Sequence, residues 1–265
     1  MQSLQSDAHS RLLDVVAFSG ALPAVVAAAL AAATGTVLVP DSQSGALATV
    51  AGLAAAGTLV IYSVDRLRDL ERDRETAPGR THFVQTHRRY VLAATVAGAA
   101  ACVPLALRMP PGVWALCAGV LTLGLWHRRL KGRAPWKVLY VAAAWLGVVV
   151  GLPVVAGGGA ALRPLAAVLA ALGVTIAANL LASDLREHSL TRARQRDLAI
   201  ARALAIAGTL FCLLDRRTWA LIPIPLFEAL SLLGFRTSER YGLVVVDGAL
   251  LVGAGLSLGV ALGGR

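Results

Sequence analysis

The amino-acid sequence predicts an all-α integral membrane protein: a single polytopic domain over residues 1–265 with about nine membrane-spanning helices. Of the 265 residues, 57% are hydrophobic and only 15% are charged, whereas roughly a quarter of the residues of a soluble globular domain are charged. The apolar residues form long runs separated by short polar stretches. This pattern excludes a soluble globular domain and a disordered chain. Cys102, Cys117 and Cys212 lie inside apolar runs without metal-ligand spacing, which argues against a disulfide framework or a zinc site.

Nine apolar runs approach the roughly 20 residues that a membrane span requires. They cover residues 12–33, 45–64, 90–107, 111–126, 137–157, 163–182, 198–214, 217–234 and 242–262. The first run is longer than the apolar core of a secretory signal peptide, and Asp7 and Asp14 interrupt the basic segment that such a peptide needs. We therefore treat it as a retained span.

The positions of the Lys and Arg residues predict the orientation of these spans, because short basic loops stay on the cytoplasmic side. Eighteen of the 25 basic residues lie in the loops after spans 2, 4, 6 and 8. The loops on the other side hold only Arg108, Arg163, Arg216 and Arg217. The sequence therefore predicts a protein of the cell inner membrane with a cytoplasmic N-terminus and an outer C-terminus. This topology and attraction to anionic lipid account for the net charge of +10, so no nucleic-acid partner is expected.

An internal repeat relates two charged segments. Residues 65–74 read DRLRDLERDR, and residues 183–192 read SDLREHSLTR. At an offset of 118 residues, the LRD of the first segment aligns with the LRE of the second, and Arg74 aligns with Arg192. Because each segment follows an even-numbered span, the sequence predicts two four-helix repeats, spans 1–4 and 5–8, with span 9 added. Membrane proteins often place their sites between such repeats.

Both segments bring acidic residues to one face of a helix. Asp65, Asp69 and Asp73 are spaced four residues apart, and Asp184 and Glu187 are spaced three apart. Carboxylates stacked in this way need solvent and the interleaved arginines as partners, as in an ordinary charged surface run, or a divalent cation. Mg²⁺ fits because it binds one or two carboxylates, several waters and substrate phosphates, and arginines bind diphosphate oxygens. The repeat favours the metal-site interpretation.

These features resemble the UbiA superfamily of intramembrane prenyltransferases. The resemblance covers the whole layout: about nine helices, an acidic motif after helix 2, another after helix 6, and a basic segment between helices 4 and 5. The first family motif is NDxxDxxxD with an arginine seven residues after its last Asp. Asp69, Asp73 and Arg80 match it, whereas Asp65 replaces the Asn and Arg66 replaces the first Asp.

The second family motif, DxxDxxxD, is only partly retained. Asp184 matches its first acid, Glu187 is a conservative replacement of the second, and Thr191 replaces the third. Arg66 and Thr191 together remove two acids, which implies a weaker, single-ion or inactive metal cluster.

The resemblance implies Mg²⁺-dependent transfer of a prenyl group from a polyprenyl diphosphate to an acceptor within the bilayer. By position, the catalytic metal ligands would be Asp69, Asp73, Asp184 and Glu187, and Asp65 on the same helical face joins the candidate metal ligands. The candidate diphosphate contacts are Arg68, Arg80, Lys131 and Lys137. The apolar helices would shield the developing allylic cation from water.

Three polar residues inside the predicted spans have alternative interpretations. Asn179, one turn before the second acidic motif, would bind substrate by orienting an acceptor or a metal-bound water, or it would form a helix–helix hydrogen bond. Glu228 and Asp247 mark a cavity, an ion pair or a protonated group, because a carboxylate is expensive in a bilayer.

Three function hypotheses follow, in this order. The retained acids favour an active prenyltransferase. Arg66 and Thr191 favour a catalytically degenerate relative that binds lipid, and only Glu228 and Asp247 suggest a transporter.

Overall fold

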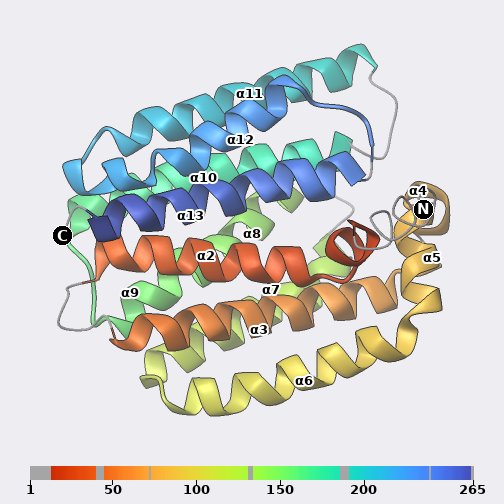
Figure 1. Ribbon diagram of the computed structural model, residues 1–265, viewed down its shortest axis with the longest axis horizontal. Coiled ribbons are helices and arrows are strands. Elements are labelled where there is room, and N and C mark those ends of the chain that lie inside the picture. Colours follow the sequence, from red (N-terminus) through yellow and green to blue (C-terminus); the bar gives the residue numbers. More distant parts are fainter. Residues whose placement is uncertain are drawn as a thin grey trace, which may run out of the picture.

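The computed structural model describes residues 13–39, 45–71, 73–130, 134–185, 191–238 and 240–263. Within these ranges all regular secondary structure is helical, which confirms the predicted fold class (Figure 1). The elements are α2 (Ala21–Leu38), α3 (Gly45–Arg68), α4 (Asp73–Thr76), α5 (Pro78–Thr86), α6 (Arg88–Leu107), α7 (Pro111–Leu130), α8 (Ala134–Leu146), η2 (Gly147–Gly151), α9 (Leu152–Ala156), α10 (Leu162–Leu185), α11 (Arg192–Cys212), η3 (Arg216–Leu221), α12 (Pro223–Leu233), η4 (Tyr241–Val246) and α13 (Asp247–Gly263).

Six helical segments in the described ranges are long and apolar enough to cross a membrane. They are α2, α3, α6, α10, the α8–α9 segment Trp136–Ala156 and the η4–α13 segment Tyr241–Gly263. Large apolar side chains cover their outer faces, including Leu92, Val96 and Val103 on α6, each more than half exposed. A surface of this kind needs lipid around it. The protein is therefore an integral membrane protein.

The other three predicted spans overlap helices that are shorter or more polar. Among the described side chains, the apolar stretch of α7 covers Pro111–Gly124, and α12 has only 11 residues, with η3 before it and Pro223 and Pro225 in its first turn. Helix α11 begins with the sequence RARQRD, so its first turns are charged. These helices complete the bundle without having the length and composition of the other six.

The first span begins later than the predicted residue 12. Residues 13–18 are helical, but the chain then breaks at Ser19 and Gly20, and α2 runs from Ala21 to Leu38. Gly20 has a φ of 83°, a left-handed conformation that glycine adopts without steric cost. The Ser19 hydroxyl oxygen accepts a hydrogen bond from the Ala21 N–H at 3.2 Å, which satisfies one of the free donors at the helix start.

Helix α2 is the central helix of the bundle (Figure 1). It packs against α3 on one side and α13 on the other, and also contacts η2 and α9. Next to α3 lies α6, and the series α13, α12, α11, α10 and α8 continues on the other side. The C-terminal ends of α3 and α10 lie at the same end of the bundle as α4 and α5, at the right in Figure 1. We call this the charged end, because the basic loops after α3 and α10 start there.

Glycine lets two helix pairs approach closely. A Cβ on Gly208 of α11 would lie 2.4 Å from the Thr175 hydroxyl oxygen of α10, and a Cβ on Gly253 of α13 would lie 2.6 Å from the Cα of Ile224 on α12. Both distances are too short for a side chain. Small residues of this kind are how membrane helices pack without a hydrophobic driving force.

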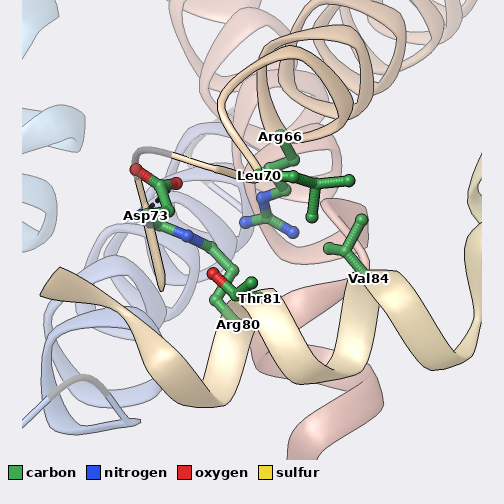
Figure 2. Close-up of a pocket in the computed structure, with 6 residues that line it drawn as sticks. All are labelled: Arg66, Leu70, Asp73, Arg80, Thr81 and Val84. Carbon is green, nitrogen blue, oxygen red and sulfur yellow. Dashed lines mark hydrogen bonds and ion pairs between the residues drawn. The ribbon is translucent and has the colours of Figure 1, made fainter. Parts of the chain in front are cut away.

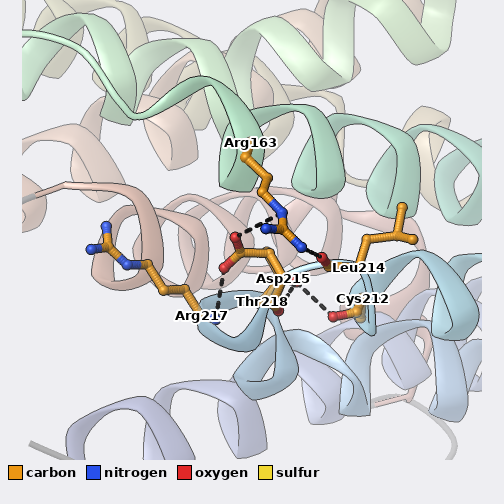
Figure 3. A network of polar contacts seen from close by, with 6 residues as sticks. All are labelled: Arg163, Cys212, Leu214, Asp215, Arg217 and Thr218. Atoms are coloured by element: carbon orange, nitrogen blue, oxygen red, sulfur yellow. Dashed lines mark hydrogen bonds and ion pairs between the residues drawn. The ribbon is translucent and has the colours of Figure 1, made fainter.

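At the opposite end of the bundle, a polar network holds the turn between α11 and η3 against α10 (Figure 3). Arg163 donates a hydrogen bond to the Leu214 carbonyl oxygen at 3.0 Å and lies 3.8 Å from the Asp215 carboxylate. The Asp215 side chain in turn accepts from the Arg217 N–H at 2.9 Å. The Thr218 hydroxyl, which is buried, donates to the Cys212 carbonyl oxygen at 2.6 Å. This network orders the turn.

Candidate functional site at the charged end

The first acidic segment is a helix end followed by a turn, which corrects the expectation of one continuous helix over 65–73. Helix α3 stops at Arg68, and α4 begins at Asp73. The backbone hydrogen bonds from Asp69 N–H to Asp65 O and from Asp73 N–H to Asp69 O, both 2.9 Å, nevertheless keep the three acids on successive turns. The chain bends because the alternating charges of this segment leave it few apolar residues to bury along α3.

The side chains of this segment differ sharply in exposure. Asp69 is buried, with 2% of its surface exposed, whereas the side chain of Glu71 is 82% exposed and pairs only with Arg74 at 3.4 Å. Asp65 and Asp73 are half-buried. Glu71 therefore points away from the face that carries the three aspartates, as its position two residues after Asp69 predicts.

Arg80 folds back onto the acidic segment (Figure 2). Its guanidinium Nη2 lies 2.7 Å from Asp73 Oδ2, and both side chains are mostly buried. The spacing of seven residues between these partners is the spacing in the family motif. Arg68, the second predicted diphosphate contact in this segment, is the last residue of α3, and its side chain is exposed. Arg80 therefore sits at the acidic segment, and in this structure its partner is a carboxylate.

Arg66, the replacement for the first motif acid, has a structural contact that sequence reasoning did not find. The side chain is buried, and it donates a hydrogen bond to the Phe18 carbonyl oxygen, just before the break at Gly20. It also shares a small hollow with Asp73 and Arg80 that is too small to hold a water molecule (Figure 2). The substituted arginine thus ties the N-terminal helical turn to α3 and adds positive charge beside the aspartates.

The second acidic segment begins in the last turn of α10. Asp184 forms an ion pair with Lys137 at the start of α8, and both side chains are partly exposed. Lys137 was predicted as a diphosphate contact by its loop position alone. Glu187 and Lys131 lie outside the described residues. Thr191 directly precedes α11 and is exposed.

Tyr140 connects the two acidic segments. It lies one turn after Lys137 on α8, and Asp65 and Asp184 are both close enough to act electrostatically on its hydroxyl group. One residue from each half of the predicted repeat therefore acts electrostatically on the same side chain. The sequence contained no signal for Tyr140, because its position depends on how α8 packs between the two acidic helix ends.

Asn179 forms a helix–helix hydrogen bond, one of its two predicted roles. Its Nδ2 donates to Asp247 Oδ1 at 3.1 Å, which joins α10 to the start of α13. Both residues line a cavity of about 20 Å³ between α2, α3, α8, α10 and α13, together with Tyr62 and Trp145. The rings of Tyr62 and Trp145 meet edge to face, with centroids 6.3 Å apart. Because five residues of helix rise about 7.5 Å, Asn179 lies between one and two turns of α10 before Asp184.

Among the described residues, no group of three or more His, Cys, Asp or Glu side chains is arranged to hold a metal ion. Asp73 and Asp184 have basic partners, and Glu187 falls outside the described ranges. Mg²⁺ does not need three protein ligands. One or two carboxylates are enough when substrate phosphates and water supply the other ligands. The donor set at the charged end fits that simpler kind of site.

Comparisons of this chain with protein families, with characterised proteins and with solved structures found no match. The functional proposal therefore depends on the motifs and on the geometry of the charged end.

Proposed function

We propose that this protein is a prenyltransferase resembling the UbiA superfamily, which moves a prenyl group from a polyprenyl diphosphate to an acceptor within the membrane. The observation that carries the proposal is that α3 and α10, which lead into the two acidic motifs, finish at the same end of the bundle (Figure 1). Two acidic motifs that lie 118 residues apart in the sequence would thereby share one site at the end of an apolar bundle. That arrangement suits a diphosphate at the membrane surface with its hydrocarbon tail between the helices.

The basic residues would bind the diphosphate by exchanging partners. In the structure, Arg80 pairs with Asp73 and Lys137 pairs with Asp184. Diphosphate oxygens are stronger partners for these cations because they carry more charge and accept several hydrogen bonds. Arg68 at the end of α3 would add a contact, and Lys131 is proposed as another from its position in the sequence alone. The exchange would release Asp73 and Asp184 for other ligands.

Mg²⁺ is the cofactor in this proposal, and its ligands would come from Asp65, Asp69, Asp73, Asp184 and Glu187. When bound, the ion would neutralise the negative charge of the departing diphosphate. Asp69, which is 2% exposed, lies one turn before Asp73 and is proposed as one of these ligands. Arg66 already supplies positive charge beside Asp73, which supports a site with fewer metal ions than an intact motif would hold.

The interior of the bundle would shield the allylic cation. The cavity lined by Asn179 and Asp247 has apolar walls from Val26, Ile176 and Leu250 and a volume of about 20 Å³, room for about one water molecule. A prenyl chain is larger than that, so its entry requires the surrounding helices to move apart. The acceptor remains unidentified, and a deletion strain analysed by lipidomics would show which prenylated product disappears.

A direct test is whether the purified protein consumes a polyprenyl diphosphate when Mg²⁺ is present. We expect release of inorganic diphosphate with Mg²⁺ and no release after EDTA is added, because metal-bound diphosphate is the leaving group. Binding without turnover would instead support a catalytically degenerate lipid-binding protein, the alternative that the buried Arg66 favours. Flux of ions or solutes into proteoliposomes would support a transporter.

The proposal includes a full topology. All nine predicted spans would cross the inner membrane as two four-helix repeats and a ninth helix, with the N-terminus and both acidic motifs in the cytoplasm and the C-terminus outside. It is supported by the common end at which α3 and α10 finish (Figure 1). It is also supported by the order of contacts, since α2, α3 and α6 are successive neighbours and so are α8, α10 and α11.

Reporter fusions test this topology. Fusions after residues 85, 130 and 190 should all report the cytoplasm, and a fusion after residue 160 should report the outside, because the basic loops alternate with loops poor in Lys and Arg. The fusion after residue 160 is the matched control for the other three. A fusion after residue 85 that reports the outside would contradict the topology.

A further inference from the structure

Three exposed arginines lie around one carboxylate at the end of the bundle opposite the charged end. Arg163 belongs to the first turn of α10, and Arg216 and Arg217 begin η3. The Arg163 guanidinium lies 3.8 Å from the Asp215 carboxylate, which also accepts a hydrogen bond from the Arg217 N–H (Figure 3). The loops predicted for this side of the membrane are poor in Lys and Arg. The fold therefore gathers most of their positive charge in one place.

Asp215 does not balance this charge. Within the described ranges it is the one acidic side chain paired with these arginines, so three guanidinium groups and one carboxylate leave two positive charges in excess. The Arg163 side chain is 81% exposed, and it donates one hydrogen bond to the Leu214 carbonyl oxygen at 3.0 Å. A guanidinium has five N–H donors. Arg163 can therefore bind an anion and keep its present contacts.

Exposed apolar side chains accompany the arginines. Leu162 and Leu214 are each more than half exposed. Trp219 is also exposed, and the Arg216 guanidinium lies over its ring, 5.8 Å from the ring centroid. Tryptophan is enriched where a membrane meets water. Cations beside exposed leucines suit a ligand that presents a phosphate and hydrocarbon chains side by side, as a phospholipid does.

We propose that Arg163, Arg216 and Arg217 form a binding site for the headgroup phosphate of an anionic phospholipid. The arginines would hold the phosphate oxygens with charge-assisted hydrogen bonds, and Leu162 and Leu214 would contact the first carbons of the acyl chains. The excess positive charge gives the site a preference for anionic over zwitterionic lipid. This site lies at the other end of the bundle from the proposed diphosphate site and does not depend on prenyl transfer.

Titration of fluorescent phosphatidylglycerol against the full-length protein in detergent tests the proposal. We expect saturable binding that unlabelled phosphatidylglycerol displaces and that phosphatidylcholine displaces much less. Inorganic phosphate at the same concentration should not displace the lipid, because it has no acyl chains. Equal displacement by phosphatidylcholine would overturn the preference for anionic lipid. Equal displacement by inorganic phosphate would show a site for free anions and would overturn the lipid assignment.

Variants of the arginines locate the binding. Arg163→Gln and Arg216→Gln should each weaken phosphatidylglycerol binding about fivefold, because one arginine near the membrane surface contributes about 1 kcal/mol of attraction to anionic lipid. Arg108→Gln is the matched control. Arg108 is exposed and follows α6, which lies on the other side of the central helix α2 from α10. An equal effect of all three changes would show a general attraction to charge and would contradict the site.

Asp215→Asn separates lipid binding from a purely structural role of the network. Asparagine keeps an oxygen that can accept from the Arg217 N–H, so the turn should remain intact. Removing the carboxylate raises the positive charge, and phosphatidylglycerol should bind several times more tightly. Unchanged or weaker binding by a variant that melts at the same temperature as the unmodified protein would overturn the proposal. If this variant does not fold, Arg216→Gln decides, because the Arg216 side chain lies over Trp219 and not in the hydrogen-bonded turn.

Discussion

Replacing Asp69 or Asp184 by asparagine is expected to abolish Mg²⁺-dependent binding of a prenyl diphosphate, whereas Glu71→Gln should leave it intact. The two aspartates come from opposite acidic segments, and Asp69 is 2% exposed. Removing one charged group from a desolvated contact, such as that of the buried Asp69, costs about 2 kcal/mol or more, which is a loss of affinity of roughly 30-fold or more. Glu71 is the matched control because it lies in the same segment with its side chain 82% exposed.

Titration of a fluorescent prenyl diphosphate against the three purified variants, with and without Mg²⁺, measures this contrast. Asparagine preserves the size of the side chain, so the variants test charge and not packing. If the acidic segments were a solvated surface run, all three changes would have similarly small effects, since exposed ion pairs contribute about 0–1 kcal/mol. Equal affinities across the three variants would therefore rule out the assignment of these acids to the site.

The second large effect concerns the packing of α12 against α13. Gly253→Ala should destabilise the protein markedly, because the added Cβ would lie 2.6 Å from the Ile224 Cα and 2.8 Å from the Pro223 carbonyl oxygen. Both atoms belong to the backbone and cannot move aside by changing a rotamer. Overpacking of this kind costs about 1–3 kcal/mol, which should appear as a lower melting temperature in detergent.

Gly255 provides the control on the same helix. No heavy atom lies within 4 Å of a Cβ built on Gly255, and the residue is exposed at the lipid-facing surface. Gly255→Ala should leave stability unchanged or raise it slightly, because alanine favours a helix over glycine by about 1 kcal/mol. If Gly253→Ala were as stable as Gly255→Ala, the close approach of α12 and α13 would be wrong.

Much of the helical layout follows from hydropathy because apolar composition and helix length are local properties of the chain. The predicted spans 45–64, 90–107 and 163–182 fall within or nearly within α3, α6 and α10. The first span was misplaced because Gly20 breaks the helix inside an apolar run, where hydropathy gives no signal. The continuous helix expected after Asp65 was also wrong, because periodic spacing of acids does not reveal where the chain turns.

The candidate site was only partly predictable for the same reason. Arg80 lies seven residues from Asp73, so a local motif was enough to connect them. The pairing of Lys137 with Asp184 and that of Asn179 with Asp247 join residues 47 and 68 positions apart. Such contacts depend on which helices become neighbours. The residue that connects the two halves, Tyr140, carries no charge at neutral pH and had no distinctive pattern around it.

Photoaffinity labelling tests the central claim most directly, namely that both acidic segments contribute to one prenyl diphosphate site. A polyprenyl diphosphate with a photoreactive group on its first isoprene unit would be bound in the presence of Mg²⁺, irradiated, and the labelled peptides identified. We predict labels in the peptides at the ends of α3 and α10 and in α8 around Tyr140, all suppressed by EDTA and by an excess of unlabelled diphosphate. Labelling confined to one acidic segment, or to neither, would contradict the account.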